Sequence, residues 1–148
     1  MQTWAQCAEK TQKSALIELF EQTQQEYFPE LSDYEIRYRE FSGKSYYFKT
    51  DFKRVTIPKS PYKRVYHLLI NRKVYDCPPS QAALQAIMIH ELTHIQYYVQ
   101  MLGFELSLYL FSLIPRSQIC QYERKTDENV LKMGHAQVLI ELREWIYP

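Results

Sequence analysis

The pattern of apolar positions changes twice along the chain and divides it into three regions. From Thr3 to about Tyr27, apolar residues fall near helical spacing with Glu, Gln and Lys between them, which predicts one long amphipathic helix. From Tyr34 onward, apolar residues alternate with charged ones, as in half-buried strands. From Ala82 to Met101 the helical period returns, so this stretch predicts a second long helix.

The alternating region predicts a small, mostly antiparallel sheet. A first strand starts at Tyr34, and Ser42-Gly43-Lys44 is suited to a hairpin turn into a second strand from Tyr46 to Lys49. A third strand is expected from Arg54 to Ile57. The segment from Arg64 to Ile70, rich in branched and aromatic residues, gives the strongest strand signal in the chain.

The remaining elements are helical. Pro79 or Ser80 lies where the second long helix should begin, and Gly103 is expected to end it. Residues Phe104 to Ile114 predict a short apolar helix or packed loop that covers the core, with a lid over a cleft or a membrane contact as the alternatives. A last helix is expected from Ser117 or Gln118 to about Ile146.

Length and composition fit one α+β domain over residues 1–148. The chain is 46% hydrophobic and 24% charged, which is sufficient for a compact core. It has three widely spaced cysteines and no C-x-x-C pattern, so neither a disulfide framework nor a thiolate zinc site is expected. Without a secretory signal or transmembrane segment in the sequence, we expect a cytoplasmic protein, and a monomer is assumed.

Positive charge is concentrated in the middle of the chain. Eleven Lys and Arg residues lie between Arg37 and Lys73, against only Glu40 and Asp51, although the net charge of the chain is +1. One interpretation is a solvated sheet face whose lysines protect strand edges. The other is a binding surface for an acidic peptide, nucleic acid or anionic lipid.

The main chemical motif is His90-Glu-Leu-Thr-His94, which lies inside the second long helix. A four-residue step turns a helix by only about 40°, so both imidazoles point toward one spot. Glu91 lies roughly 100° round the helix, where its carboxylate can reach a water bound at that spot without being a ligand. Met88, Leu92, Ile95 and Val99 fall on the opposite side and should face the core.

A hydrolytic zinc site needs three protein ligands, so a third donor must come from elsewhere. Glu123 opens the sequence Glu-Arg-Lys-Thr-Asp on the last predicted helix, 29 residues after His94. Asp127 follows one turn later on the same face, where it can accept the far ring N–H of a ligating histidine. Glu-x-x-x-Asp alone is common on solvated helices, and its pairing with the histidine motif is what favours a metal site.

The combination HELTH and ERKTD resembles the gluzincins, zinc metallopeptidases with H-E-x-x-H and a later E-x-x-x-D. The chain looks most like the minigluzincins, their minimal single-domain members, over roughly Arg64 to Glu144. This resemblance implies that His90, His94 and Glu123 bind Zn²⁺, that Glu91 is general base and acid, and that Asp127 orients His90. The expected activity is hydrolysis of peptide bonds in a peptide or protein substrate.

Several features of such an enzyme stay open in the sequence. An oxyanion donor besides zinc would come from a set of four residues, which are Tyr97, Tyr98, Tyr122 and His135. An extended substrate is expected to pair with an edge strand between Tyr46 and Ile70, and the basic residues there would favour acidic substrates. The resemblance also raises self-blocking of the cleft by the C-terminal segment from Glu144 to Pro148.

Two other functions are consistent with the sequence. The first keeps the zinc but not the catalysis, as a latent or zinc-stabilised domain that binds partners through its basic strands. The second is nucleic-acid binding through Lys44 to Lys73, and it is the weaker of the two. In that case the bases would stack on Tyr46, Tyr47, Phe48 and Phe52.

Overall fold

The centre of the sheet is β3 (Val65–Asn71), the segment with the strongest strand signal in the sequence. The computed structural model describes residues 4–44, 46–76, 78–111, 115–136 and 140, apart from the side chains of residues 4–11 and 110. β3 pairs in parallel with β1 (Glu35–Phe41) and antiparallel with β2 (Phe48–Phe52). The α+β class is as predicted, but the sheet is mixed rather than mostly antiparallel.

The predicted hairpin between the first two strands is wrong, because β3 lies between β1 and β2. The chain instead crosses the end of β3, where Asn71 holds the crossing segment. The side-chain amide of Asn71 donates to the carbonyl oxygens of Gly43 at 2.9 Å and Tyr46 at 2.6 Å. The most apolar strand thereby gains a hydrogen-bonded neighbour on each edge, which a hairpin between the other two would not give it.

The third predicted strand, from Arg54 to Ile57, is also wrong. Residues Arg54–Thr56 form a short 3-10 helix, η2, and Pro61–Lys63 form a second, η3. The Thr56 hydroxyl donates to the carbonyl of Lys53 at 2.6 Å and accepts from the backbone N–H of Val65 at 3.1 Å. These local bonds satisfy the groups that a strand ladder would have used.

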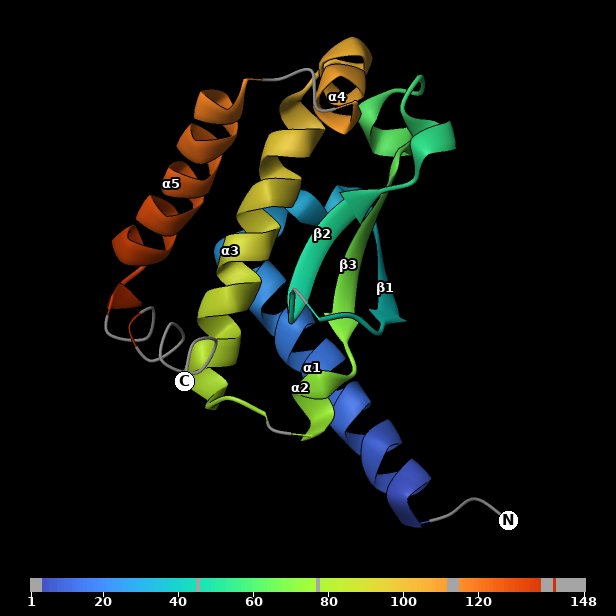
Figure 1. Ribbon diagram of the computed structural model, residues 1–148, viewed down its shortest axis with the longest axis vertical. Coiled ribbons are helices and arrows are strands. Elements are labelled where there is room, and N and C mark those ends of the chain that lie inside the picture. Colours follow the sequence, from blue (N-terminus) through green and yellow to red (C-terminus); the bar gives the residue numbers. More distant parts are fainter. Residues whose placement is uncertain (1–3, 45, 77, 112–114, 137–139, 141–148) are drawn as a thin grey trace.

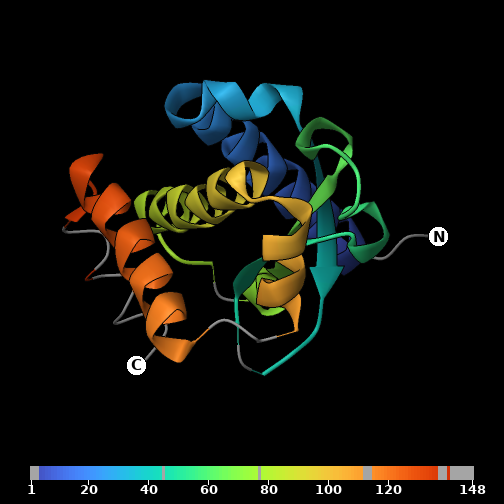
Figure 2. The same ribbon diagram turned by 90° about the horizontal axis from the view of Figure 1, so that it is seen from above.

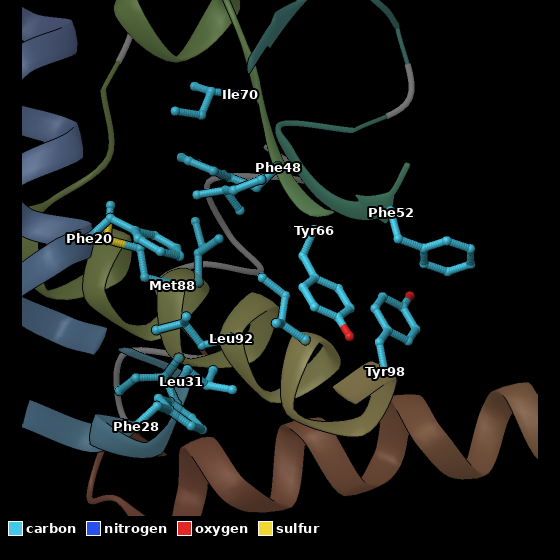
Figure 3. Close-up of a cluster of buried hydrophobic side chains, with 14 of the residues drawn as sticks. Phe20, Phe28, Leu31, Phe48, Phe52, Tyr66, Ile70, Met88, Leu92 and Tyr98 are labelled. Carbon is cyan, nitrogen blue, oxygen red and sulfur yellow. The ribbon is translucent and has the colours of Figure 1, made fainter. Parts of the chain in front are cut away.

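The core lies between the sheet and two long helices. α1 (Trp4–Tyr27) and α3 (Gln81–Gln100) pack against each other and against the sheet, and α3 stands between β2 and α5 (Arg116–Lys132) (Figure 1). Figure 3 shows the buried side chains that meet there, with Tyr66 and Ile70 from the sheet above Met88 and Leu92 of α3. The four positions predicted to face the core, Met88, Leu92, Ile95 and Val99, are all buried.

α1 confirms the predicted N-terminal helix. Leu16 and Phe20 are buried in the core, and the Phe20 ring meets Tyr38 of β1 edge to face at 5.2 Å. The side chains of Trp4, Cys7 and Ala8, also predicted on the apolar face, lie outside the described part. The chain leaves the helix through a 3-10 turn, η1 (Pro29–Asp33), that buries Leu31 completely.

The helix that carries HELTH begins as predicted, with the Ser80 hydroxyl accepting from the N–H of Ala83 at 3.2 Å. α2 (Lys73–Asp76) is a single turn before it. Gly103 was expected to end this long helix, but α3 stops at Gln100 and Gly103 begins α4 (Gly103–Leu110). A Cβ at Gly103 would lie 3.0 Å from the carbonyl oxygen of Ile57, so this position requires the close backbone approach that glycine allows.

The last helix begins near its predicted start but is shorter than predicted. α5 ends at Lys132 because Gly134 adopts φ 88°, and the N–H groups of Gly134 and His135 bond back to Leu131 and Val130 in a Schellman motif. The predicted continuation to Ile146 falls mostly outside the described residues. Among the helices that are described, none combines the length and the apolar character needed to cross a bilayer.

A buried arginine connects the start of β3 to the end of α3. The Arg64 residue is only 4% exposed, and no ion pair in the described part of the chain involves it. Its guanidinium donates to the carbonyl oxygens of Lys59 at 3.0 Å and Met101 at 2.7 Å. The side chain thus joins its own loop to Met101, which lies 37 residues later in the sequence.

We expect Arg64→Met to lower the free energy of unfolding by about 2–4 kcal/mol, because the buried guanidinium is removed and two partly buried carbonyls lose a charged donor. Arg54→Met is the matched control, since Arg54 is an exposed residue of η2, and it should change stability by about 0.5 kcal/mol or less. Urea denaturation followed by circular dichroism measures both. Equal losses of unfolding free energy in the two variants would show that the hydrogen bonds of Arg64 to Lys59 and Met101 do not stabilise the fold.

Candidate metal centre

Two imidazoles from α3 meet on the side of the helix that faces α5. The Nε2 atoms of His90 and His94 are 3.2 Å apart, with ring centroids separated by 4.9 Å. His94 is 7% exposed, and its ring stacks beside that of Tyr98 at 6.3 Å. The stripe formed by Met88, Leu92 and Ile95 is buried on the opposite side of the helix, so the histidine pair stands on a fixed support.

The third donor comes from α5. Glu123 Oε2 lies 3.5 Å from Nε2 of His90 and 3.5 Å from Nε2 of His94. On the same face of α5, one and two turns later, Thr126 and Val130 are fully buried where this helix packs on α3. The residues predicted as ligands from two helices therefore converge as one group.

The separations between these atoms allow a test of whether zinc would fit. Four ligands about 2.05 Å from a tetrahedral zinc ion lie roughly 3.3 Å apart, whereas neighbouring ligands of an octahedral ion at that distance lie roughly 2.9 Å apart. The three observed edges are 3.2, 3.5 and 3.5 Å. Two imidazole nitrogens and one carboxylate oxygen at these distances match a tetrahedral site better than an octahedral one.

Asp127 stands behind the first histidine, as predicted. Its Oδ1 lies 3.2 Å from Nδ1 of His90. A carboxylate in this place accepts the Nδ1–H proton and so favours the tautomer whose Nε2 lone pair points at His94 and Glu123.

The charges of the site favour a cation. Burial alone would lower the pKa of His90, but hydrogen bonds to Asp127 and Glu123, together with the charge of Glu91, raise it to about 10. The imidazoles of His90 and His94 hold the pKa of Glu123 well below its ordinary value. Three carboxylates near two imidazoles thus stabilise a positive charge between them, whether it is a proton or a metal ion.

The group opens into a cleft of about 460 Å³ between β2, α3, α4 and α5. Glu91 lines this cleft together with His90, His94 and Glu123, and the Glu91 residue is 8% exposed. Lys49 and Arg54 line the cleft as well, and so does Asp51. Both cations belong to the stretch from Arg37 to Lys73 in which positive charge is concentrated, and which we call the basic segment. The basic segment therefore contributes side chains to the cleft wall.

The four proposed oxyanion donors are placed differently from one another. Tyr98 lines the cleft, and its burial raises the pKa of the phenol well above the usual value, an effect to which hydrogen bonding with Tyr109 adds. Tyr97 and Tyr122 instead contact each other at 5.8 Å and do not line the cleft. His135 lies against Tyr27, with Nε2 3.3 Å from the phenol oxygen, and is not part of the cleft wall.

Sequence reasoning missed Tyr109, which lines the cleft from α4. Its ring lies 5.6 Å from that of Tyr98. The segment around it was interpreted as core cover because it is so apolar. The position of Tyr109 between the two motifs in the sequence could have indicated its place, because the chain passes near the site on its way from α3 to α5.

Two aromatic residues that a nucleic-acid surface would need are buried. Phe48 and Phe52 are 6% and 5% exposed, and the Phe52 ring meets Tyr98 edge to face at 5.3 Å. They are therefore unavailable for stacking on bases. The predicted self-blocking segment, residues 144–148, lies outside the described residues.

Comparisons of the chain with models of protein families, with curated proteins and with solved structures found no match. The resemblance to the gluzincins therefore depends on the two sequence motifs and on the geometry described above.

We expect zinc binding at pH 7 to release close to one proton from His90, because the carboxylates around it hold this imidazole protonated until a metal replaces the proton. Calorimetry in buffers of different ionisation enthalpy measures the release. Asp127→Asn should lower both the number of protons released and, by about 10–100-fold, the zinc affinity. Glu128→Gln, an equal charge change on the next residue, is the control, and identical behaviour of both variants would exclude this role for Asp127.

Proposed function

We propose that this protein is a zinc-dependent endopeptidase of the gluzincin type. The observation that carries the proposal is the convergence of His90, His94 and Glu123 at separations suited to tetrahedral zinc, at the wall of a cleft that Glu91 also lines. The donor set leaves room for a fourth, exchangeable ligand, as hydrolytic zinc sites require.

Zinc bound by these side chains would lower the pKa of water to about 7 and polarise a peptide carbonyl. Among the described residues of the cleft wall, two carboxylates lie outside the three-donor group, namely Glu91 and Asp51. In the proposed reaction Glu91 accepts the proton of the attacking water and returns it to the leaving amine. Among the described phenols of the cleft wall, which include Tyr46, the two that contact each other, Tyr98 and Tyr109, are our candidates for donation to the oxyanion.

A substrate strand has an edge to bind in this cleft. β2 pairs with β3 on one side, and no other strand of the described sheet pairs with its second side. Five of its residues, Phe48 to Phe52, line the cleft. An extended peptide added to this edge would pass in front of the donor group and would bring its scissile bond toward Glu91.

Glu91→Gln should leave zinc bound at the wild-type stoichiometry while lowering peptide cleavage by about 10²–10⁴-fold, because the amide cannot accept the proton. Zinc content by mass spectrometry and hydrolysis of a quenched fluorescent peptide measure the two effects separately. Glu128→Gln, outside the cleft, should be as active as the wild type. Undiminished cleavage by Glu91→Gln would refute the role, and a wild-type protein that binds zinc but cleaves nothing would favour the latent zinc domain.

The charges of the cleft wall lead to an expectation about the substrate. Lys49 and Arg54 should favour peptides with acidic residues beside the scissile bond, so an acidic peptide should have a several-fold higher kcat/KM than its basic counterpart. Arg54→Glu should reduce or invert this ratio. Lys44→Glu, the same charge change away from the cleft wall, should not change it, and a wild-type preference for the basic peptide would contradict the expectation.

A further inference from the structure

One end of the molecule carries most of the exposed apolar side chains. Of the nine large hydrophobic residues that are exposed in the described part of the chain, six lie on the segments 55–62 and 102–111. We call this group the apolar end, and it comprises Val55, Tyr62, Leu102, Phe104, Leu108 and Phe111. Figures 1 and 2 show that α4 and the two 3-10 turns lie together at the end of the sheet where β3 begins.

The exposed apolar stripe of α4 is continuous. Phe104, Leu108 and Phe111 are spaced by four and three residues, so they fall within about 60° on one side of the helix. Their exposed fractions are 63%, 40% and 69%. Leu106 points roughly the opposite way and is fully buried, so α4 already satisfies the core with another side. The three side chains of the stripe are not needed for the packing of the core, and their exposure to water is unfavourable.

The apolar end has a defined shape, because its parts are held together from inside. Arg64 donates to the carbonyls of Lys59, in the turn segment, and of Met101, the C-cap of α3 two residues before α4 begins. The close approach of Gly103 to the Ile57 carbonyl adds a second attachment between these two segments. Val55 and Leu102 are thereby presented on neighbouring segments of one surface.

The charges beside the apolar end are all of one sign on the turn segment. Residues 53–64 contain five basic residues and no acidic residue. Four of the five are exposed, namely Lys53, Arg54, Lys59 and Lys63, and no ion pair of the described residues involves any of them. We call these four the basic rim. On α4 the acidic Glu105 is occupied in capping, since it accepts from the N–H of Leu102 at 2.7 Å.

From this arrangement we infer that the apolar end is a peripheral membrane-binding surface for anionic lipid bilayers. Phe104, Leu108 and Phe111 insert at the level of the headgroups, while the basic rim lies against the negative surface. A second copy of the chain is a poorer occupant, because a symmetric contact would bring two basic rims together. This inference does not depend on the proposed peptidase activity.

The test is cosedimentation of the full-length protein with vesicles of phosphatidylcholine alone or with 30% phosphatidylserine, with and without a metal chelator. We expect binding to the anionic vesicles, at least tenfold weaker binding to the neutral ones, and weakening in 0.5 M salt, all independent of the chelator. Phe104→Ser with Phe111→Ser should reduce binding at least tenfold, and so should Lys59→Glu with Lys63→Glu.

Two control variants match these changes elsewhere on the surface. Leu131→Ser with Ile140→Ser removes two other exposed apolar side chains, and Lys44→Glu with Lys73→Glu reverses two charges beyond the opposite end of β3. Both should bind like the wild type. Absence of binding to any vesicle, equal binding to neutral and anionic vesicles, or control variants as impaired as the test variants would overturn the inference. A concentration-dependent dimer in sedimentation velocity that Phe104→Ser with Phe111→Ser abolishes would assign the surface to a second copy instead.

Discussion

The packing of α5 on α3 is the constraint on which the candidate site depends. Thr126 and Val130 are fully buried at this contact, and Glu123 and Asp127 share their side of the helix. A rotation of α5 that withdrew the carboxylates from the histidines would expose both buried side chains, at a cost of about 2 kcal/mol for the valine alone. The burial of Thr126 and Val130, which take no part in the candidate site, therefore fixes the position of Glu123 and Asp127, which do.

The same contact concentrates negative charge. Glu91, Glu123 and Asp127 all act on His90, and Glu123 also acts on His94; the mutual repulsion of the three carboxylates opposes the packing that brings them together. A proton on His90 offsets part of this repulsion, and a divalent ion would offset more of it. Any cation bound by the folded state alone stabilises that state by mass action, so metal affinity and resistance to unfolding should rise together.

How much of this could be predicted from sequence depends on the range of the contacts. The direction of His90 and His94 follows from helical spacing alone, and so do the buried positions Met88 and Leu92. The prediction that Glu123 lies beside the two histidines required only one further condition, namely that the last helix packs against α3. The strand order could not be predicted in this way, because it is decided by long-range contacts such as those of Asn71 with the segment that crosses the end of β3.

The prediction of a strand from Arg54 to Ile57 failed for a related reason. Its composition suits a strand, but the Thr56 hydroxyl and the prolines supply local bonds and fixed dihedral angles that favour 3-10 turns. Gly103 was misread as a helix end because glycine commonly serves that purpose, whereas here it allows α4 to approach the backbone at Ile57. In each case a contact distant in sequence, or a side-chain bond to the backbone, outweighed the periodic pattern.

α4 divides its surface among three environments. Leu106 enters the core, Tyr109 lines the cleft, and the stripe of Phe104, Leu108 and Phe111 faces solvent. The first two directions lie roughly 130–170° from the centre of the stripe, so the segment from Phe104 to Phe111 is long enough to separate them. Because folding and the cleft use only the first two, the stripe can be changed without removing a buried contact or a cleft residue. The fold and the site therefore do not account for three large apolar side chains in water, and this is why an external surface must be considered for them.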